Sequence, residues 1–285
     1  MCLCFFVSDI HGKINKYEKL FKEIKTEKPE IVFFGGDLLP SLAFNKTVEK
    51  KFSDFINDYI LKKFSEIKDL LGSDYPKIFL ILGNDDPKIE ESSLLKAEKS
   101  GAFKYMHNKK VKYKKYKIYG YANIPPTPFF LKDWERYDVS RYVDPGCVPP
   151  TEGYRTIKTN EDVEYATIQK DLEKLADNDD LSHSVFLFHS PPYKTNLDRA
   201  ALDGQIVDFV PLDVHVGSIA IKRFIEEKQP TVTLHGHVHE SSQITGKWQQ
   251  KIGKTFAFSA AYNGKELAII KFDLNNPSVA YRVLI

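Results

Sequence analysis

Short apolar runs alternate with amphipathic stretches along most of this chain. The runs lie at residues 3–8, 31–34, 78–82 and 185–188, and none shows the polar alternation of a half-exposed strand; residues 231–234 (Thr-Val-Thr-Leu) are a further predicted strand. Continuous apolar runs of this length predict strands that are buried on both faces, and the stretches between them have helical periodicity. The alternation therefore predicts an α/β fold made of βαβ units.

The same pattern predicts four helices, which span residues 13–26, 47–71, about 160–177 and 219 to about 228. The first helix should bury Leu20, Phe21 and Ile24 on one face. Ser218 is the expected N-cap of the last helix. Asp86 followed by Pro87 is interpreted as the N-cap and first position of a further helix.

Residues 109–119 predict a β-hairpin that turns at Lys114-Lys115. This register pairs Tyr113 with Tyr116 and Val111 with Ile118, so four apolar side chains share one face. An alternative interpretation of the same segment is a basic and aromatic patch that binds nucleic acid. We favour the hairpin, with its lysines on a solvated face.

Residues 121–156 differ from the rest of the chain because they hold six prolines, one tryptophan and several tyrosines without regular periodicity. Irregular segments of this length usually cover a site or bind something. The last part, residues 254–285, predicts strands with turns at Asn263-Gly264 and at residues 275–277. Repeats and Ser/Gly-rich linkers are absent from the sequence, so we expect a single domain over residues 1–285 with an irregular insertion at about 121–156.

Composition excludes several classes of protein. The formal net charge of +2 over 285 residues gives no reason to expect long nucleic acid or an acidic membrane as a partner. Three cysteines cannot form a disulfide framework, and Cys2 and Cys4 are expected to be core thiols of the first strand. The first residues lack the cationic segment of a signal peptide, and no apolar run reaches membrane-spanning length. The expected location is the reducing cytoplasm.

Seven oxygen and nitrogen donors follow the apolar runs in order. Such a set of carboxylate, imidazole and amide ligands without thiolates suits Mn²⁺, Fe, Zn²⁺ or Co²⁺ and argues against a structural zinc site. Asp37 has two oxygens and could bridge two ions, and Gly236 would let the backbone pass close to the ions. The seven are Asp9, His11, Asp37, Asn84, His189, His237 and His239.

These motifs together resemble the calcineurin-like metallophosphoesterase superfamily, whose pattern is D-x-H, G-D, G-N, a lone His and G-H-x-H. The resemblance covers about residues 1–240 in the correct order. It implies a four-layer α/β/β/α sandwich of the metallo-dependent phosphatase type with two divalent metal ions. It also implies that Asp9, His11, Asp37 and His239 hold one ion, and that Asp37, Asn84, His189 and His237 hold the other.

One position departs from the commoner family pattern, in which a histidine follows the asparagine of G-N. Here that residue is Asp85, which could act as a general acid only if its pKa were raised, and two nearby cations would oppose this. His215 is an alternative acid if its loop reaches the site. His235 is expected to point away, and His107 and His183 to be surface residues.

Other residues are candidate substrate contacts. Tyr193 could close the pocket, and the backbone N–H groups of Gly217 and Ser218 could bind a phosphate. Arg199, Trp134 and Tyr137 are further candidates. Ordinary packing is the competing interpretation for each of them.

The sequence thus predicts a dinuclear-metal hydrolase in which metal-bound hydroxide attacks a small phosphoester, with a phosphodiester or nucleotide favoured. One alternative is a catalytically weak member of the superfamily that serves as an interaction module. Another is a nuclease, although the near-neutral charge argues against long nucleic acid.

Overall fold

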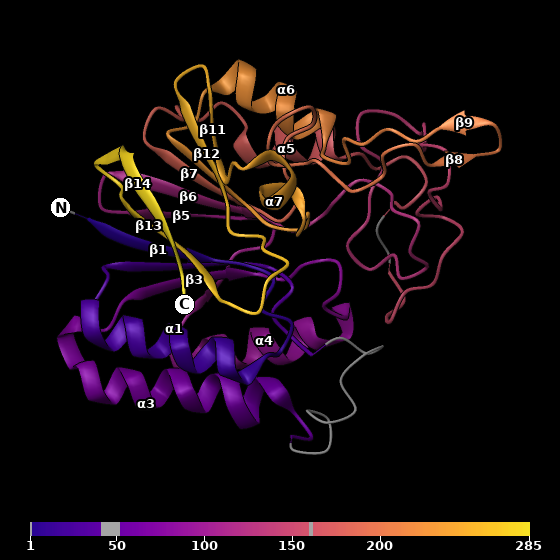
Figure 1. Ribbon diagram of the computed structural model, residues 1–285. Helices are drawn as coiled ribbons and strands as arrows, with labels where there is room; N and C mark the ends of the chain where they lie inside the picture. The colour runs from indigo at the N-terminus through magenta and orange to yellow at the C-terminus, as the bar shows by residue number, and fades with distance from the viewer. Residues whose placement is uncertain (1, 41–51, 160–161) are drawn as a thin grey trace.

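Two mixed six-stranded sheets packed face to face form the centre of the molecule (Figure 1). The computed structural model describes residues 2–40, 52–159 and 162–285. The strand order is β14-β13-β1-β2-β3-β4 in the first sheet and β11-β12-β10-β7-β6-β5 in the second. A two-stranded ribbon, β8-β9, stands apart from both.

The strands of the first sheet are β1 (Leu3–Val7), β2 (Ile31–Gly35), β3 (Lys77–Ile81), β4 (Lys104–Tyr105), β13 (Ala268–Asp273) and β14 (Asn276–Leu284). Those of the second are β5 (Lys109–Tyr113), β6 (Tyr116–Tyr121), β7 (Ser184–Phe188), β10 (Val232–His235), β11 (Gln249–Ile252) and β12 (Thr255–Ser259). The ribbon consists of β8 (Ile206–Val207) and β9 (Val210–Pro211).

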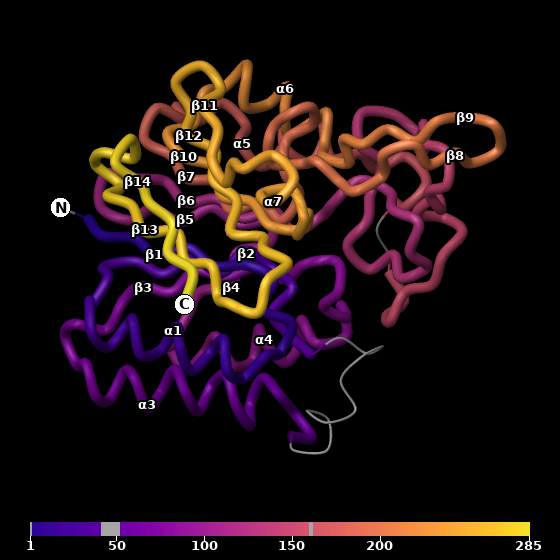
Figure 2. The backbone as a smooth tube through the Cα atoms, in the orientation of Figure 1, coloured from indigo at the N-terminus to yellow at the C-terminus, as the bar shows by residue number. Residues whose placement is uncertain are grey.

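Helices cover the outer face of each sheet, as the tube in Figure 2 also shows. The first sheet carries α1 (Ile14–Glu27), α3 (Lys62–Leu71) and α4 (Glu91–Ala97), and the second carries α5 (Ile168–Ala176) and α6 (Ile219–Lys228). The short helix α7 (Ser241–Thr245) follows β10. One apolar core fills the space between the sheets and under α1 and α3, and a second lies under α5 and α6. The predicted four-layer α/β/β/α sandwich is confirmed.

The apolar runs form the buried strands that the sequence predicted. Every residue of β2 and of β7 is buried, which explains why neither run alternates with polar residues. The hairpin is also confirmed, because Val111 pairs with Ile118 and Tyr113 with Tyr116 in the antiparallel β5-β6 ladder.

Two predicted helices begin in a part of the chain that can be compared only partly with the structure. Residues 47–51 and 160–161 lie outside the described residues, but residues 52–54 and 162–167 are described and are not helical, so the predictions of helix over those residues are wrong. Within the described part, the first of these helices begins with a π-helical turn at Ile56–Leu61. The other begins at Ile168, because the Thr167 side chain accepts a hydrogen bond from the Lys170 N–H and so caps the helix there.

Ser218 is confirmed as the N-cap of α6, since its Oγ accepts a hydrogen bond from the Ile221 N–H at 3.0 Å. The C-terminal strands complete the first sheet. β13 pairs antiparallel with β1, placing Cys4 opposite Phe272, while β2 pairs parallel with the other edge of β1. The described residues between 122 and 156 form neither a helix nor a named strand and lie at one end of the sheets, beside the β8-β9 ribbon.

Candidate metal centre

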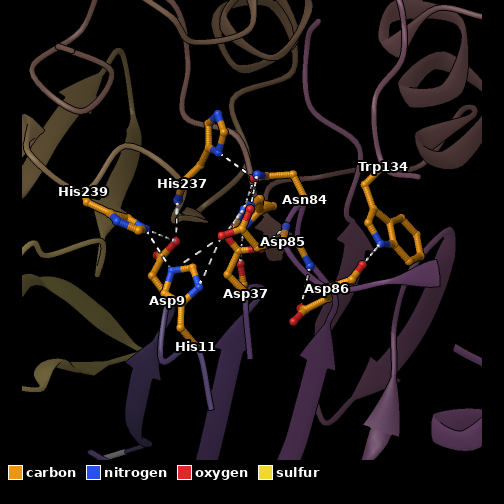
Figure 3. Close-up of polar contacts among 12 residues, drawn as sticks. Asp9, His11, Asp37, Asn84, Asp85, Asp86, Trp134, His237 and His239 are labelled. Atoms are coloured by element: carbon orange, nitrogen blue, oxygen red, sulfur yellow. Dashed lines mark hydrogen bonds and ion pairs between the residues drawn. The ribbon is translucent and has the colours of Figure 1, made fainter. Parts of the chain in front are cut away.

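The seven predicted donors converge where strands of the two sheets end. Asp9 and His11 follow β1, Asp37 follows β2 and Asn84 follows β3, and these three strands are parallel neighbours in one sheet. In the other sheet His189 follows β7, and His237 and His239 follow the neighbouring parallel strand β10. Carboxyl ends of parallel strands are where α/β folds form their sites. Figure 3 shows the labelled donors pointing toward one another.

Four of these side chains form one compact group. Asp9, His11, Asp37 and His239 each place a donor atom within 4.8 Å of those of the other three. His239 Nε2 lies 3.1 Å from Asp9 Oδ1 and 3.2 Å from His11 Nε2. The other carboxylate oxygen, Asp9 Oδ2, is buried and has no hydrogen-bond partner among the described residues. A buried carboxylate oxygen without a donor is what a cation site provides, so these residues fit a bound metal ion.

The remaining donors form a second group beside the first. Asn84 Oδ1 lies 2.9 Å from His189 Nε2 and 2.7 Å from His237 Nδ1. Asp37 belongs to both groups, because its Oδ2 lies 3.3 Å from His189 Nε2 and 4.0 Å from His11 Nε2. One carboxylate therefore faces both sets of ligands.

The backbone at the donors is held in an uncommon conformation. Asp9, His11, Asp37 and His237 all have positive φ angles, of 56°, 50°, 52° and 73°. Non-glycine residues adopt this region rarely, and clusters of such residues are typical of functional sites. The chain therefore turns sharply at the donors that follow β1, β2 and β10.

Hydrogen bonding fixes the imidazole of His189. Its Nδ1 donates to the Gly35 carbonyl oxygen at 2.7 Å, because that oxygen can only accept. Nε2 is thereby left to face Asn84 and Asp37. A backbone carbonyl that orients a histidine in this way is common behind metal ligands.

The pKa values of the donor side chains are shifted by burial and by the carboxylates gathered at the site. Burial alone would lower the pKa of His189, but the carboxylates of Asp37 and Asp9 outweigh it and raise this pKa to about 10. Burial likewise opposes ionisation of Asp9, yet the hydrogen bond from His239 lowers its pKa. Burial together with the charge of His189 lowers the pKa of His237 to about 3. Buried carboxylates that draw a positive charge onto a fully buried histidine favour a cation at the same place.

Asp85 lies at the rim of this cluster. Its backbone N–H donates to Asp37 Oδ1 at 2.8 Å, and its Oδ2 lies 3.5 Å from His11 Nδ1. Burial and the charge of Asp37 raise its pKa to about 6. The side chain is 42% exposed, so it can be reached from solvent.

The other candidate acid, His215, lies in a different environment. Its Nδ1 is 2.9 Å from Oδ1 of the fully buried Asp198, and its ring packs edge-on against Tyr193. It lines a cavity of about 350 Å³ between the insertion and residues 193–219. None of the seven donors lines this cavity. Within the described part of the chain, the hydrogen bond of the His215 side chain is to Asp198 and not to any of these donors.

Asp86 does not cap a helix, so that prediction is wrong. The following helical turn, Lys88–Glu90, has no side-chain cap among the described residues. The Asp86 carboxylate instead accepts hydrogen bonds from the backbone N–H groups of Leu38, Leu39 and Gly83, at 2.7 to 3.0 Å. Burial and the charge of Asp37 raise its pKa to about 8, although these three donors oppose the shift. The side chain joins the loop that carries Asp37 to the loop that carries Asn84.

Several minor predictions need correction. Trp134 is fully buried, and its indole N–H donates to the Asp86 carbonyl oxygen, so it is no substrate contact. The N–H groups of Gly217 and Ser218 are already bonded to Asp198 and to the Pro191 carbonyl. His107 is half-buried rather than an ordinary surface residue, since its Nδ1 accepts from the Ala122 N–H and its ring packs on Trp134.

His183 is exposed, as predicted. His235 turns away from the donors, because its ring nitrogens bond to the Ser190 carbonyl oxygen and the Thr233 hydroxyl. Arg199 forms an ion pair with Asp203.

Comparison with known proteins agrees with this geometry. The model of the calcineurin-like phosphoesterase family matches residues 4–241. One crystal structure superposes over 99% of this chain and 98% of its own, with a TM-score of 0.61 and 17% identity. The TT1561 protein of Thermus thermophilus covers 99% and 98%, with a TM-score of 0.54 and 14% identity.

A Staphylococcus aureus protein provisionally named as a 5′-nucleotidase is similar over 99% of this chain but only 52% of its own, with a TM-score of 0.50 and 12% identity. At these identities the structures show a shared fold. A comparison with curated proteins finds no significant sequence match.

Proposed function

Because this chain belongs to the calcineurin-like phosphoesterase family, we propose that it hydrolyses a small phosphoester, with a phosphodiester or nucleotide as the favoured substrate, by means of two divalent metal ions. The observation that carries the proposal is the shared position of Asp37 between two groups of buried donors. A single carboxylate facing two ligand sets supports a dinuclear rather than a mononuclear centre.

The proposed first site consists of Asp9, His11, Asp37 and His239, and the proposed second site of Asp37, Asn84, His189 and His237. Both sets contain oxygen and imidazole nitrogen without sulfur, which suits Mn²⁺, Fe, Zn²⁺ or Co²⁺. When bound, two such ions activate water and neutralise phosphoryl oxygens.

The protein contributes orientation to this chemistry. The Gly35 carbonyl keeps His189 Nε2 directed at the second set, and the His237 N–H holds Asp9 Oδ1 at 3.0 Å. These contacts fix the donors before any substrate arrives, so little reorganisation is needed during reaction.

For the group that contacts the leaving oxygen we propose Asp85, with His215 as the alternative. Asp85 lies beside His11 and is accessible from solvent. His215 is oriented by Asp198 toward a cavity that the insertion helps to form. Asp85→Asn and His215→Ala separate the two, because the residue that serves the leaving group should matter more for a poor leaving group, such as an alkoxide, than for p-nitrophenolate.

The test of the proposed function is Mn²⁺-dependent turnover of bis-p-nitrophenyl phosphate. We expect wild-type protein to release p-nitrophenolate and the Asp37→Asn, Asn84→Ala double variant to be inactive. Equal rates for the metal-loaded wild type and this variant would refute an enzymatic role and favour the interaction module. A nuclease would show binding to long nucleic acid that weakens steeply with salt.

The setting of the enzyme is also a proposal. We propose a single domain that works in the reducing cytoplasm. Cys2, Cys4 and Cys147 are all free, and Cys2 and Cys4 are buried, which agrees with a reducing compartment. No helix in the described part of the chain is both long and apolar enough to cross a membrane.

A further inference from the structure

The segment Lys132–Glu135 of the insertion is buried along its whole length. Its four residues are charged or aromatic, and none is more than 2% exposed. Polar side chains are buried at this level only when they have partners, so each of these residues is expected to hold something in place. Asp133 and Trp134 each have a partner in the loop that follows Asn84.

Trp134 contacts this loop directly (Figure 3). Its Nε1–H donates to the Asp86 carbonyl oxygen at 2.7 Å. The Lys88 ammonium lies 4.9 Å from the centroid of its ring. The indole is enclosed, with the His107 ring packed edge-on against it.

Asp133 holds the same loop two residues further along. Its Oδ2 accepts a hydrogen bond from the Lys88 backbone N–H at 2.7 Å. The carboxylate is itself held by the Thr156 N–H and hydroxyl. The insertion thus binds the carbonyl of Asp86 and the N–H of Lys88, on the two sides of Pro87.

The side chain of Asp86 connects to two loops that carry metal ligands. The Asp86 carboxylate accepts hydrogen bonds from Leu38 and Leu39, directly after Asp37, and from Gly83, directly before Asn84. Moving Asp86 would therefore change the distance between Asp37 and Asn84, two donors of the proposed second site.

The segment is stiff enough to act as a support. Lys132 and Glu135 form a fully buried ion pair at 2.6 Å, and Thr127 donates to Glu135 through both its N–H and its hydroxyl. The backbone around Trp134 is paired as well, because its carbonyl accepts from the Ile124 N–H at 2.8 Å. Closed networks of this kind rigidify the backbone that carries them.

We propose that Asp133 and Trp134 are positioning residues of the second metal site, so that the insertion sets the geometry of Asn84 by way of Asp86. This inference rests on the dinuclear centre of the proposed function. It assigns the insertion a role in assembling the site in addition to any role in covering it. Partners behind a metal ligand typically change metal affinity by about 10–100-fold when they are removed.

The experiment measures metal binding to the full chain. Mn²⁺ affinity and stoichiometry are determined for wild type, Trp134→Phe and Tyr137→Phe. The last variant is a matched control, because Tyr137 is buried in the same insertion and its hydroxyl lies 3.4 Å from Thr151, which belongs to neither metal loop. For Trp134→Phe we expect one of the two Mn²⁺ sites to lose about 10–100-fold in affinity while the other is unchanged, and for Tyr137→Phe no change at either site.

A second measurement is independent of whether Trp134→Phe folds. In Trp248→Phe, Trp134 supplies the single indole N–H resonance, and its hydrogen exchange can be followed with and without Zn²⁺, a diamagnetic ion that does not broaden the resonance as Mn²⁺ would. Because coupling between two interactions is reciprocal, Zn²⁺ should slow this exchange if Trp134 strengthens metal binding.

Wild-type Mn²⁺ affinity in Trp134→Phe, or indole exchange indifferent to Zn²⁺, would overturn the inference. Loss of one of the two sites in a protein that hydrolyses no phosphoester would support the inference and refute the proposed function.

Discussion

Replacing Gly236 by alanine should damage the first metal site through a steric contact. A Cβ at this position would lie 2.7 Å from Asp9 Oδ2 and 3.0 Å from Ser8 Cβ. Real Cβ atoms essentially never approach other atoms within 3.0 Å, and ordinary contact begins at 3.4 Å. The carboxylate oxygen must therefore move by between 3.0 − 2.7 = 0.3 Å and 3.4 − 2.7 = 0.7 Å. Gly236 does not have a positive φ, so alanine adds no backbone strain of that kind.

The shift exceeds what a metal site tolerates, because ligand distances are held to about 0.2 Å. Asp9 cannot simply rotate away, since Oδ1 is held by the His237 N–H at 3.0 Å and lies 3.1 Å from His239 Nε2. We expect Gly236→Ala to lower the affinity of the first site for its ion by about 10–100-fold. Overpacking should also reduce the free energy of unfolding by about 1–3 kcal/mol.

The assay is metal content by mass spectrometry after gel filtration, together with competition against a chelator. Gly204→Ala is the matched control, because its φ of 71° brings backbone strain while nothing lies within 4 Å of the added Cβ. It should lose stability and keep both ions. Full retention of two ions with wild-type affinity in Gly236→Ala would show that Asp9 Oδ2 is not a ligand.

Three further predictions concern stability. Ser218→Ala removes the N-cap of α6 and should cost about 1 kcal/mol, or about 2–4 °C in Tm by calorimetry; an unchanged Tm would contradict the cap. Hydrogen bonds from Lys117, Lys110 and Tyr119 lower the pKa of Asp179 from its ordinary 3.8, so its contribution is present above that pH and lost as the pH falls further. Asp179→Asn should therefore lower Tm at pH 7 by more than it does at about pH 2, and equal losses at both would refute the assignment. Mn²⁺ at 100 times its Kd should stabilise the fold by about 2.7 kcal/mol per ion, an effect that EDTA abolishes, and a Tm indifferent to metal would argue against the site.

The features that can be predicted well from the sequence are those with local signals. Continuous apolar runs identify buried strands without knowledge of their partners, and a donor placed just after such a run must emerge at the sheet edge. The hairpin at residues 109–119 is correct despite the unfavourable Lys114-Lys115 turn, because its paired apolar face outweighs the turn. Lys114 adopts a φ of 51° to make that turn.

The errors concern side chains whose partners are distant in sequence. Asp86 before Pro87 has the local form of a helix cap, but its carboxylate bonds to Leu38 and Leu39, almost fifty residues away. The prediction of Trp134 as a substrate contact is wrong because periodicity says nothing about which face of an irregular segment is buried. The sequence offers one signal that Trp134 is buried, namely a tryptophan that lies between charged residues and near many prolines.

The pairing of β1 with β13 has a consequence for how the chain is made. Leu3 pairs with Asp273, a separation of 273 − 3 = 270 residues. At about 5–20 residues per second, ribosomes need on the order of 15–50 s to produce the strand that completes this pair. During that time one edge of the apolar Leu3–Val7 strand has no native partner and offers free backbone groups to other chains. The first strand of the nascent protein is therefore open to aggregation during this interval, and slower synthesis should prolong it.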